Sequence, residues 1–453
     1  MFQKFTDIMN FLWGTPLVLF VTAVGIFLTI RIGFFQFTHI RHTFRRTFGM
    51  FFGKTKEAPE GEGNMTPFQS LSAVSAGTIG AGNIAGIASA IAIGGPGAAF
   101  WMWIIALFGT AIKMAEVALA VKYRKKSDNG DFHGGPMYYI KEGLNNSKFS
   151  IVLAFVFAIG LTILVITDAC FVQPNTLATS LEDVFNVPTI VSGIACCLIG
   201  ILVVAGGLKG IGTFCGWMVP PMVLVYVIGT LGVIIANINA VPDAFVSIFK
   251  YAFAPAPAVG GFAGATVKLA MARGAARGIF SSECGEGTSC TVHATAITEH
   301  PVHQSLWGII EVFLDTFFVS TLTALTVIVS GVISTGETGA VLTLEAFRTT
   351  WGSFGVIMLC IAIVLFAFSS YLGFFIEWKT CIVYLFGEKK AKFIQWVYFL
   401  PPLISAGLEI EVVWTLADAS VGFVIIPNLI GLIAVSGIFT KLVKDYKEKW
   451  KLR

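Results

Sequence analysis

The chain has 453 residues, of which 56% are hydrophobic and only 12% are charged, and its mean hydropathy is +0.81. Soluble domains carry about 25% charged residues, so this composition excludes an ordinary soluble protein and favours a polytopic membrane protein. The net charge of +4 comes from Lys and Arg clustered between apolar segments, which fits membrane orientation better than nucleic-acid binding. The eight cysteines lie mostly inside apolar segments and indicate small buried side chains rather than disulfides or a metal site.

The apolar segments predict an all-α protein with about eleven transmembrane helices, at about 20 residues per span. Their expected ranges are 14–34, 68–94, 98–121, 150–180, 190–207, 214–237, 262–296, 304–331, 353–386, 394–408 and 412–440. The first segment lacks a small-residue cleavage pattern, so we expect it to be retained rather than removed as a signal peptide. The apolar surface of such a bundle predicts contact with membrane lipid.

The connections between these helices alternate in charge. The basic ones contain Arg31, Arg41, Arg45, Arg46, Lys54 and Lys56, then Lys122, Arg124, Lys125 and Lys126, then Lys389, Lys390 and Lys392, and the tail from Lys441 to Arg453. The alternate connections are acidic, with Glu182, Asp183, Glu337, Glu345, Glu409 and Glu411. Basic connections are cytoplasmic in most membrane proteins. We therefore expect an integral plasma (inner) membrane protein with its N-terminus outside and its C-terminus in the cytoplasm.

Two of the predicted helices are interrupted by glycine and polar residues. The first interruption is Ala76–Asn83, and the second, five helices further on, is Gly278–Thr288. Unpaired peptide groups in hydrocarbon each cost on the order of several kcal/mol, so unwound backbone persists only where it lines a cavity or binds a ligand. Because five is odd, the two interrupted helices cross the membrane in opposite directions, which is typical of inverted repeats with a site between broken helices.

This pattern predicts that the chain is divided into three parts. Residues 1–64 form an extra N-terminal helix and a basic connection, 65–240 the first five-helix repeat, and 241–453 the second repeat and a basic tail. The N–H groups of a half-helix can hold a carboxylate, while released carbonyls and hydroxyls can hold a small hard cation such as sodium. An amino acid with a co-transported cation fits both ends. Phosphate fits less well, because neither a P-loop run nor a converging Arg pair lies near either interruption.

Several strings in the chain carry a resemblance to a known family. They are Ile79–Gly86, Gly94–Gly97, Phe100–Trp103, Gly134–Tyr139, Val259–Ala265, Ala276–Ser281 and Ile426–Asn428. Together they resemble the alanine/glycine:cation symporters, also called the sodium:alanine symporters, over nearly the whole chain. The resemblance implies a leucine-transporter-type fold and sodium-coupled uptake of a small neutral amino acid into the cytoplasm. It implies Na+ as the coupling ion and no organic cofactor.

The resemblance also implies site residues. The substrate would be bound by Thr78, Ala81, Gly82, Asn83, Gln173, Phe280 and Phe374, with its carboxylate on Ala81 and Gly82 and with Phe280 as an aromatic lid. The sodium ion would be bound by Ala76, Ile79, Phe366, Ser369 and Ser370.

The chain departs from the family pattern at a few of these positions. Family members usually have Thr at Ala81, Trp at Phe374, and a Tyr-Tyr-Gly-Glu run at Ile376–Lys379. Glu286 and Asp168 are additional acids. The alternatives are therefore a larger or more polar amino acid such as glutamine or serine, or coupling to protons instead of sodium.

Some ionisable residues have both functional and structural interpretations. Glu286 could contact a polar substrate or carry a proton, or it could simply be solvated in a water-filled break. Asp168 precedes Gln173 by five residues, about 140° around an α-helix, so the two should not share a face, and Asp168 is expected to make a structural hydrogen bond. Glu116 and Lys113 are spaced to pair on one helix face.

Other functions fit the pattern less well. The three histidines after the second interruption, His293, His300 and His303, lack the further ligands of a tetrahedral metal site. A channel would need a continuous polar lining, whereas the sequence shows two discrete interruptions. An enzyme would need a nucleophile with a base or a metal set, and the sequence shows neither. The sequence does not predict an oligomeric state.

Overall fold

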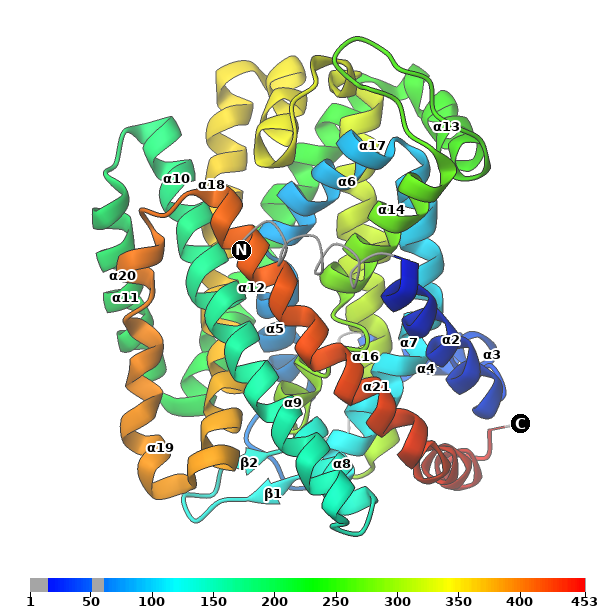
Figure 1. Cartoon of the computed structure of the whole chain (residues 1–453), viewed down its shortest axis with the longest axis vertical. Helices are drawn as coiled ribbons and strands as arrows, with labels where there is room; N and C mark the ends of the chain where they lie inside the picture. The colour runs from blue at the N-terminus through cyan, green and yellow to red at the C-terminus, as the bar shows by residue number, and fades with distance from the viewer. Residues whose placement is uncertain (1–14, 51–60, 453) are drawn as a thin grey trace.

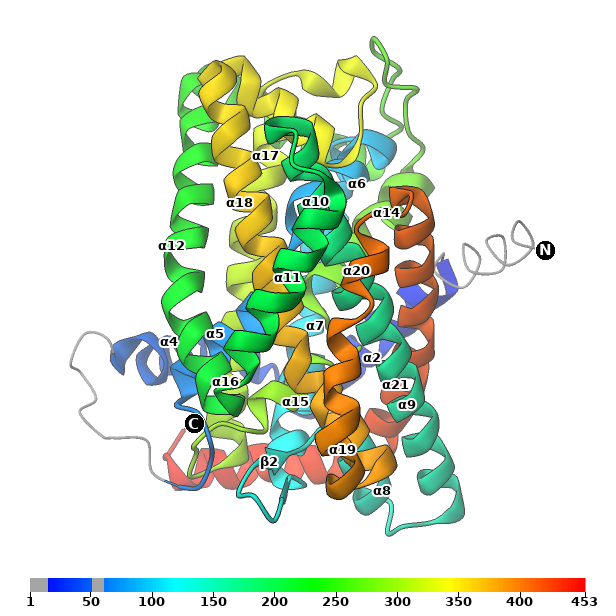
Figure 2. The same ribbon diagram turned by 90° about the vertical axis from the view of Figure 1, so that its left-hand side faces the viewer.

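The computed structural model describes residues 15–50 and 61–452, and it forms a bundle of long helices (Figures 1 and 2). Predictions about residues 1–14, Lys54, Lys56 and Arg453 lie outside the described residues. The described elements are helical apart from two short strands, β1 (Lys125–Lys126) and β2 (Phe132–His133). These strands pair antiparallel, with Lys125 opposite His133, in the basic connection after the third predicted helix.

Six helical spans in the described part of the chain are long and apolar enough to cross a membrane. They are α7 (Gly97–Lys122), α9 to α10 (Lys148–Phe185), α12 (Gly207–Ala236), α16 to α17 (Pro301–Val329), α18 (Gly339–Phe386) and Val412–Lys449 of α21 (Ile410–Lys449). A seventh is the bent pair α5 (Pro67–Thr78) and Gly82–Gly94, which includes α6 (Ile87–Gly94). The predicted number of eleven stays a prediction, because the remaining apolar helices are shorter than a full span.

The shorter helices complete the bundle. They are α2 (Thr15–Arg31), α3 (Phe35–Thr38), α4 (Ile40–Arg46), α8 (Pro136–Gly143), α11 (Thr189–Val204), α13 (Val241–Phe253), α14 (Val267–Ser282), α15 (Ser289–His293), α19 (Glu388–Ile394) and α20 (Pro402–Ser405). The apolar helices α2 and α11 correspond to predicted segments, while α13 was not predicted and lies at one end of the bundle (Figure 1).

Two predicted ranges need correction, and a third matches one half of a kinked helix. Residues 262–266 and 283–288 of the range 262–296 are not helical, since β-bridges hold the chain before α14 and two glycines with positive φ follow it. The range 394–408 is divided by a 3₁₀ segment, Gln395–Phe399. The range 353–386 is confirmed, since it coincides with the part of α18 after Gly352, where a φ of 59° that suits glycine kinks the helix; the helical residues 339–351 before the kink were not predicted.

Local sequence signals start the helices that matter for the site. Thr66 and Gln69 form a reciprocal capping box around Pro67 at the start of α5. The hydroxyl of Thr266 accepts the N–H of Leu269 at the start of α14. These caps satisfy backbone donors that would otherwise be exposed to the bilayer interior or to its interface.

Small residues let the central helices approach closely. A Cβ on Gly274 of α14 would lie 2.0 Å from the Ala98 oxygen of α7, and a Cβ on Gly373 of α18 would lie 2.8 Å from the Gly77 nitrogen of α5. Such contacts are how helices pack without a hydrophobic driving force in lipid. The pair α5 and α6 consequently lies inside the bundle, packed against α12, α14 and α18 (Figures 1 and 2).

Candidate functional site

The first interruption is a true break in the helix. α5 ends at Thr78, Ile79 has a non-helical ψ of 82°, and the helix resumes at Ala81 with its axis bent by 53°. The N–H of Gly80 donates to the Thr78 carbonyl at 3.0 Å and to Asn83 Oδ1 at 3.1 Å. The first N–H groups of the second half, at Ala81 and Gly82, have no intrahelical acceptor by geometry. The break therefore presents donors to whatever lies beside it.

Side chains from three other helices meet this break. A Cβ on Gly80 would lie 2.5 Å from Ser370 Oγ of α18 and 3.4 Å from Gln173 Oε1 of α10 (Gln173–Phe185). A Cβ on Gly82 would lie 3.0 Å from the ring of Phe280 on α14, and one on Gly77 would lie 3.8 Å from the ring of Phe374 on α18. The structure thus brings Gln173, Phe280 and Phe374 around the unwound backbone.

Two buried polar atoms near the break have no protein partner. Gln173 Oε1 and Thr78 Oγ1 are buried, and neither makes a hydrogen bond within the described part of the chain. Leaving a buried acceptor unpaired costs about 1–3 kcal/mol, so native structures rarely do it without a reason. A ligand that donates N–H groups would satisfy both atoms.

The prediction that Asp168 and Gln173 lie on different helix faces is wrong. Gln173 Nε2 donates to Asp168 Oδ1 at 3.1 Å. The reason is a π-helical turn over Asp168–Val172, in which residues five apart come into line, so the 3.6-residue period does not apply. The expected structural hydrogen bond of Asp168 is present, and it orients the Gln173 amide so that Oε1 is left for another partner.

Asn83 is held by a polar network on the other side of the break. Its Nδ2 donates to Asp315 Oδ1 at 2.6 Å and lies 3.1 Å from both Ser281 Oγ and Ser320 Oγ. Ser281 also donates to Asp315 Oδ2 at 2.6 Å. This network ties the break to α14 and to the π-helical turn Phe313–Ser320. The side chain of Asn83 therefore faces protein groups.

The sequence interpretation missed Asp315, Ser281 and Ser320. A carboxylate within a predicted membrane helix was the signal that could have found Asp315, because such residues are costly and mark functional positions.

The residues predicted for sodium cluster at the end of α5. Ser369 Oγ lies 3.3 Å from the Ala76 carbonyl oxygen and 2.9 Å from that of Phe366, and Ser370 Oγ donates to the Gly77 carbonyl at 2.9 Å. Ala76, Phe366, Ser369 and Ser370 are fully buried. Neutral carbonyl and hydroxyl oxygens suit a small hard cation, so the donor set fits sodium. Ile79 follows directly, at the unwound residue.

Phe280 belongs to a layer of side chains over the break. Its ring lies 5.9 Å from that of Trp414, and the Arg277 guanidinium lies over both rings at 5.5 and 5.4 Å. Arg277 also pairs with Asp418 at 3.6 Å, which joins α14 to α21. These contacts cover one side of the break.

The second interruption is held by ionic and polar side chains. Lys113 of α7 donates to the Glu283 carbonyl at 3.4 Å and to Ser289 Oγ, and it pairs with Glu311 of α16 at 3.0 Å. The prediction that Lys113 pairs with Glu116 is therefore wrong.

Glu116 has a different partner, because the fold brings the side-chain amide of Asn428 next to it. Its Oε1 accepts from Asn428 Nδ2 at 2.6 Å, and the same Nδ2 donates to the Gly285 carbonyl at 2.8 Å. Gly287 is required here, since its φ is 72° and a Cβ would lie 2.4 Å from Pro136.

Two further acids lie near the second interruption. Glu286 and Glu377 are each 3% exposed, and Glu286 Oε1 and Glu377 Oε2 make no hydrogen bond within the described residues. The interpretation of Glu286 as a side chain solvated by bulk water is thus wrong for this conformation, because the break is enclosed. His293 is likewise buried and contacts Glu311 Oε2 at 3.1 Å.

Comparisons with known proteins agree with this architecture. A model of the sodium:alanine symporter family matches residues 1–453. The sodium/alanine symporter AgcS of Methanococcus maripaludis is 36% identical over 443 residues, covering 97% of this chain and 96% of that protein. The probable sodium/glutamine symporter GlnT of Bacillus subtilis is 33% identical over 444 residues, covering 98% and 90%.

A solved structure is similar in fold. The manganese transporter of Eremococcus coleocola superposes with a TM-score of 0.52 over 86% of this chain and 88% of that one, at 13% identity. This likeness places the chain in the leucine-transporter-type fold. The matched family and relatives are transporters, so the chain is a membrane transporter and not an enzyme. It belongs to the sodium:alanine symporter family.

Proposed function

We propose that this transporter couples the inward movement of sodium to the uptake of a small neutral amino acid of the alanine or glycine class. The observation that carries the proposal is the break at Ile79–Ala81, where backbone donors lie beside the unpaired acceptors Gln173 Oε1 and Thr78 Oγ1. Donors and acceptors side by side match the two charged ends of an amino acid. The relative from Methanococcus maripaludis, described as a sodium/alanine symporter, supports the same substrate class.

Each end of the substrate has a matching group. The carboxylate would lie on the N–H groups of Ala81 and Gly82, where the positive end of the second half-helix favours an anion. The ammonium group would donate to Gln173 Oε1, an amide oxygen that can only accept, and to the hydroxyl oxygen of Thr78. Phe280 lies 3.0 Å from a Cβ position on Gly82, so its ring contacts the start of the second half-helix.

The cation would lie beside the substrate, among neutral oxygens. The Ser369 hydroxyl already lies 3.3 Å from the Ala76 carbonyl oxygen and 2.9 Å from that of Phe366, and Ser370 and Ile79 adjoin these residues. A set without a carboxylate suits a monovalent ion better than a divalent one. Sodium bound there would hold α5 against α18 and so favour the conformation that binds the substrate.

The charge pattern supports an orientation. We infer that the C-terminus and the connections containing Lys122–Lys126 and Lys389–Lys392 face the cytoplasm, and that the N-terminus lies outside. We also infer that residues 65–240 and 241–453 are the two inverted repeats, since each contains one broken helix near its start.

A second candidate is a proton-coupled transporter, or one for a more polar amino acid such as glutamine or serine. The observation in its favour is the pair of enclosed acids, Glu286 and Glu377, each with an oxygen that has no protein partner. A carboxylate buried without a counter-charge is costly, so a proton, a cation or a polar substrate group is expected to bind there. The relative from Bacillus subtilis is described as a probable sodium/glutamine symporter.

The deciding experiment is uptake of labelled alanine and glycine into proteoliposomes containing the full chain. An inward sodium gradient should drive accumulation, and an equal potassium gradient should not. Uptake that needs no gradient would contradict the proposal and favour a channel. Empty liposomes serve as the control.

The second candidate has its own test. In sodium-free medium, an inward proton gradient should drive uptake that Glu286→Gln abolishes if the acid pair carries the coupling proton. Labelled glutamine and serine are measured in parallel. No proton-driven uptake of any of these amino acids, together with sodium-driven uptake of alanine only, would reject this candidate.

A further inference from the structure

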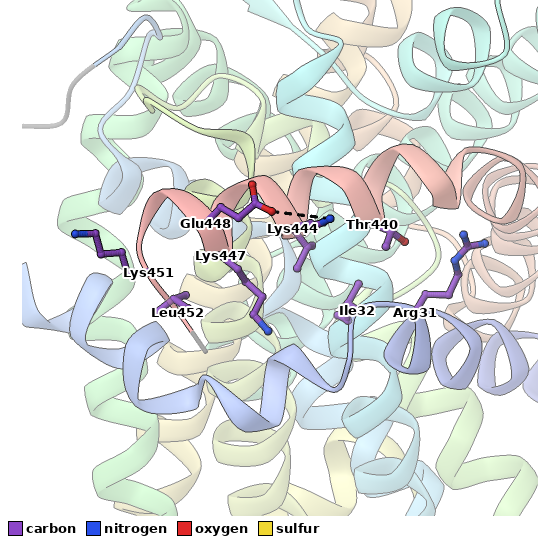
Figure 3. A pocket seen from close by; sticks show the side chains of 9 residues that line it. Arg31, Ile32, Thr440, Lys444, Lys447, Glu448, Lys451 and Leu452 are labelled. Atoms are coloured by element: carbon purple, nitrogen blue, oxygen red, sulfur yellow. Dashed lines mark ion pairs between the residues drawn. The ribbon is translucent and has the colours of Figure 1, made fainter.

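A basic groove lies away from the transport site, between the end of α2 and the tail of α21. It has a volume of about 540 Å³. Its lining residues are Arg31, Ile32, Thr440, Val443, Lys444, Lys447, Glu448, Lys451 and Leu452. Figure 3 shows Lys447 extending from α21 toward the ribbon of the N-terminal helices, and Arg31 at the other end of the groove. Segments more than 400 residues apart in the chain thus form one cavity.

The groove has an excess of positive charge. Four cations and one carboxylate line it. Glu448 lies 3.9 Å from Lys444, but both side chains are largely exposed, so this pair is weak. Within the described residues, Lys447, Lys451 and Arg31 have no carboxylate partner within ion-pair distance. The groove therefore offers at least three cations to an anion.

The walls of the groove are held in place by aromatic contacts. Tyr446 stacks on Trp450 at 4.2 Å, and its hydroxyl lies 2.9 Å from His42 Nε2 on α4. Burial, helped by Arg46 nearby, lowers the pKa of His42 to about 4, so this ring is neutral and the positive charge comes from Lys and Arg. Arg31 donates to Ser436 Oγ at 3.1 Å, which fixes its guanidinium at the rim. These contacts hold α2, α4 and α21 together around the groove before a ligand arrives.

The position of the groove indicates which anion it meets. Arg31 is the last residue of α2, an apolar helix whose outer face exposes Leu19, Ile26 and Ile30. Exposed aliphatic side chains on a helix of a membrane transporter face lipid chains. The groove therefore begins where hydrocarbon ends, at the depth of the lipid phosphates, whichever way the protein is oriented.

We propose that this groove binds anionic phospholipid, with Lys447 and Lys451 contacting phosphate at one end, Arg31 contacting a second phosphate at the other end, and the acyl chains along α2. Juxtamembrane cations contribute roughly 1 kcal/mol each toward anionic lipid, and Arg adds a two-pronged geometry that matches phosphate oxygens. Bound lipid would add to the contact between α2 and the tail of α21, which the Arg31–Ser436 hydrogen bond already joins. The proposal is independent of the transported substrate.

The test is native mass spectrometry and thermal unfolding of the full chain in detergent, titrated with phosphatidylglycerol or phosphatidylcholine. Phosphatidylglycerol should be retained and should raise the unfolding midpoint, while phosphatidylcholine should do neither. The double variant Lys447→Gln with Lys451→Gln should weaken phosphatidylglycerol binding by about 30-fold, because each cation contributes a factor of roughly five. Arg31→Gln alone should weaken it by about fivefold or more.

The matched control removes two exposed cations elsewhere, Lys389→Gln with Lys390→Gln, and should change binding by less than twofold. Equal losses in the control would overturn the proposal, because they would indicate attraction to net charge alone. Equal retention of both lipids would also overturn it. A third arm adds inorganic phosphate or glycerol 3-phosphate, and stabilisation by these soluble anions equal to that by the lipid would assign the groove to a free phosphate instead.

Discussion

The two interrupted helices differ in which groups at their breaks have bonding partners. At the first, around Gly80, acceptors of Gln173 and Thr78 are left without partners. At the second, around Gly285, the backbone carbonyls are held by Lys113 and Asn428. The backbone carbonyls of the second break are therefore bound by protein side chains, although Glu286 and Glu377 beside it each keep a buried oxygen that has no partner among the described residues. Similar sequence patterns thus have different local bonding, because different side chains pack against each break.

The largest expected effect tests the architectural role of the second break. Lys113→Met leaves Glu311 buried without its ion-pair partner and should lower the free energy of unfolding by about 3–5 kcal/mol. Thermal unfolding of the purified protein measures it. Lys125→Met breaks an exposed pair with Glu142 and is the control, expected to cost less than about 1 kcal/mol. Equal shifts in the two variants would show that the buried pair is not what holds the break.

The next effect tests whether the first break binds substrate. Gln173→Ala removes the unpaired acceptor and should weaken amino-acid binding by about 1.5–3 kcal/mol, at least tenfold, because hydrogen bonds to charged groups are strong. Sodium affinity should change much less. Calorimetric isotherms for both ligands measure the two effects.

A control is needed because Gln173 also bonds Asp168. Asp168→Asn keeps a polar partner for the Gln173 amide and should leave substrate affinity within about twofold. Unchanged binding of every amino acid to Gln173→Ala would remove this residue from the site.

A third prediction concerns the close packing at the first break. Gly80→Ala places a methyl group 2.5 Å from Ser370 Oγ and should reduce sodium-driven uptake by about 10- to 100-fold, as expected for overpacking of about 1–3 kcal/mol. Gly437→Ala is the control, since a Cβ there meets nothing within 4 Å. Normal uptake by Gly80→Ala would mean that the break is wider during transport than this conformation shows.

The smallest expected effect tests which residues bind the cation rather than the substrate. Ser369→Ala removes one hydroxyl oxygen from the set near Ala76 and should raise the sodium concentration for half-maximal uptake by about three- to tenfold. Ser370→Ala should act in the same direction. Ser330→Ala, whose hydroxyl bonds only its own helix at Thr326 and Val327, is the control. An unchanged sodium dependence in the two site variants would exclude Ser369 and Ser370 from cation binding.

Much of the membrane architecture could be read from the chain. Apolar runs of span length and their interruption by glycine are local features, so the breaks after Thr78 and after Ser282 fall inside the predicted stretches. The family membership was also predictable, because the strings around Gly80 and Phe280 are local and ordered. Helix ends were less accurate elsewhere, since the β-bridges before α14 delay its start and a 3₁₀ segment divides the range 394–408.

Which buried side chains bond one another could not be predicted from helical spacing. Helical spacing paired Lys113 with Glu116, yet Glu311, 198 residues away, is the partner, because α16 packs directly against α7. The regular 3.6-residue period separated Asp168 from Gln173, yet a π-helical turn aligns them.

Local sequence was therefore enough to predict a membrane transporter with two broken helices, because apolar runs and glycine-rich interruptions can be recognised from neighbouring residues alone. Which side chains close on those breaks depended on the packing of the whole bundle. Asn83 meets Asp315, and Arg31 meets the tail of α21, only after helices far apart in the chain come together. Hydrogen bonds and ion pairs act over about 3 to 4 Å. The spacing of residues along one helix does not determine which residues of two different helices come that close.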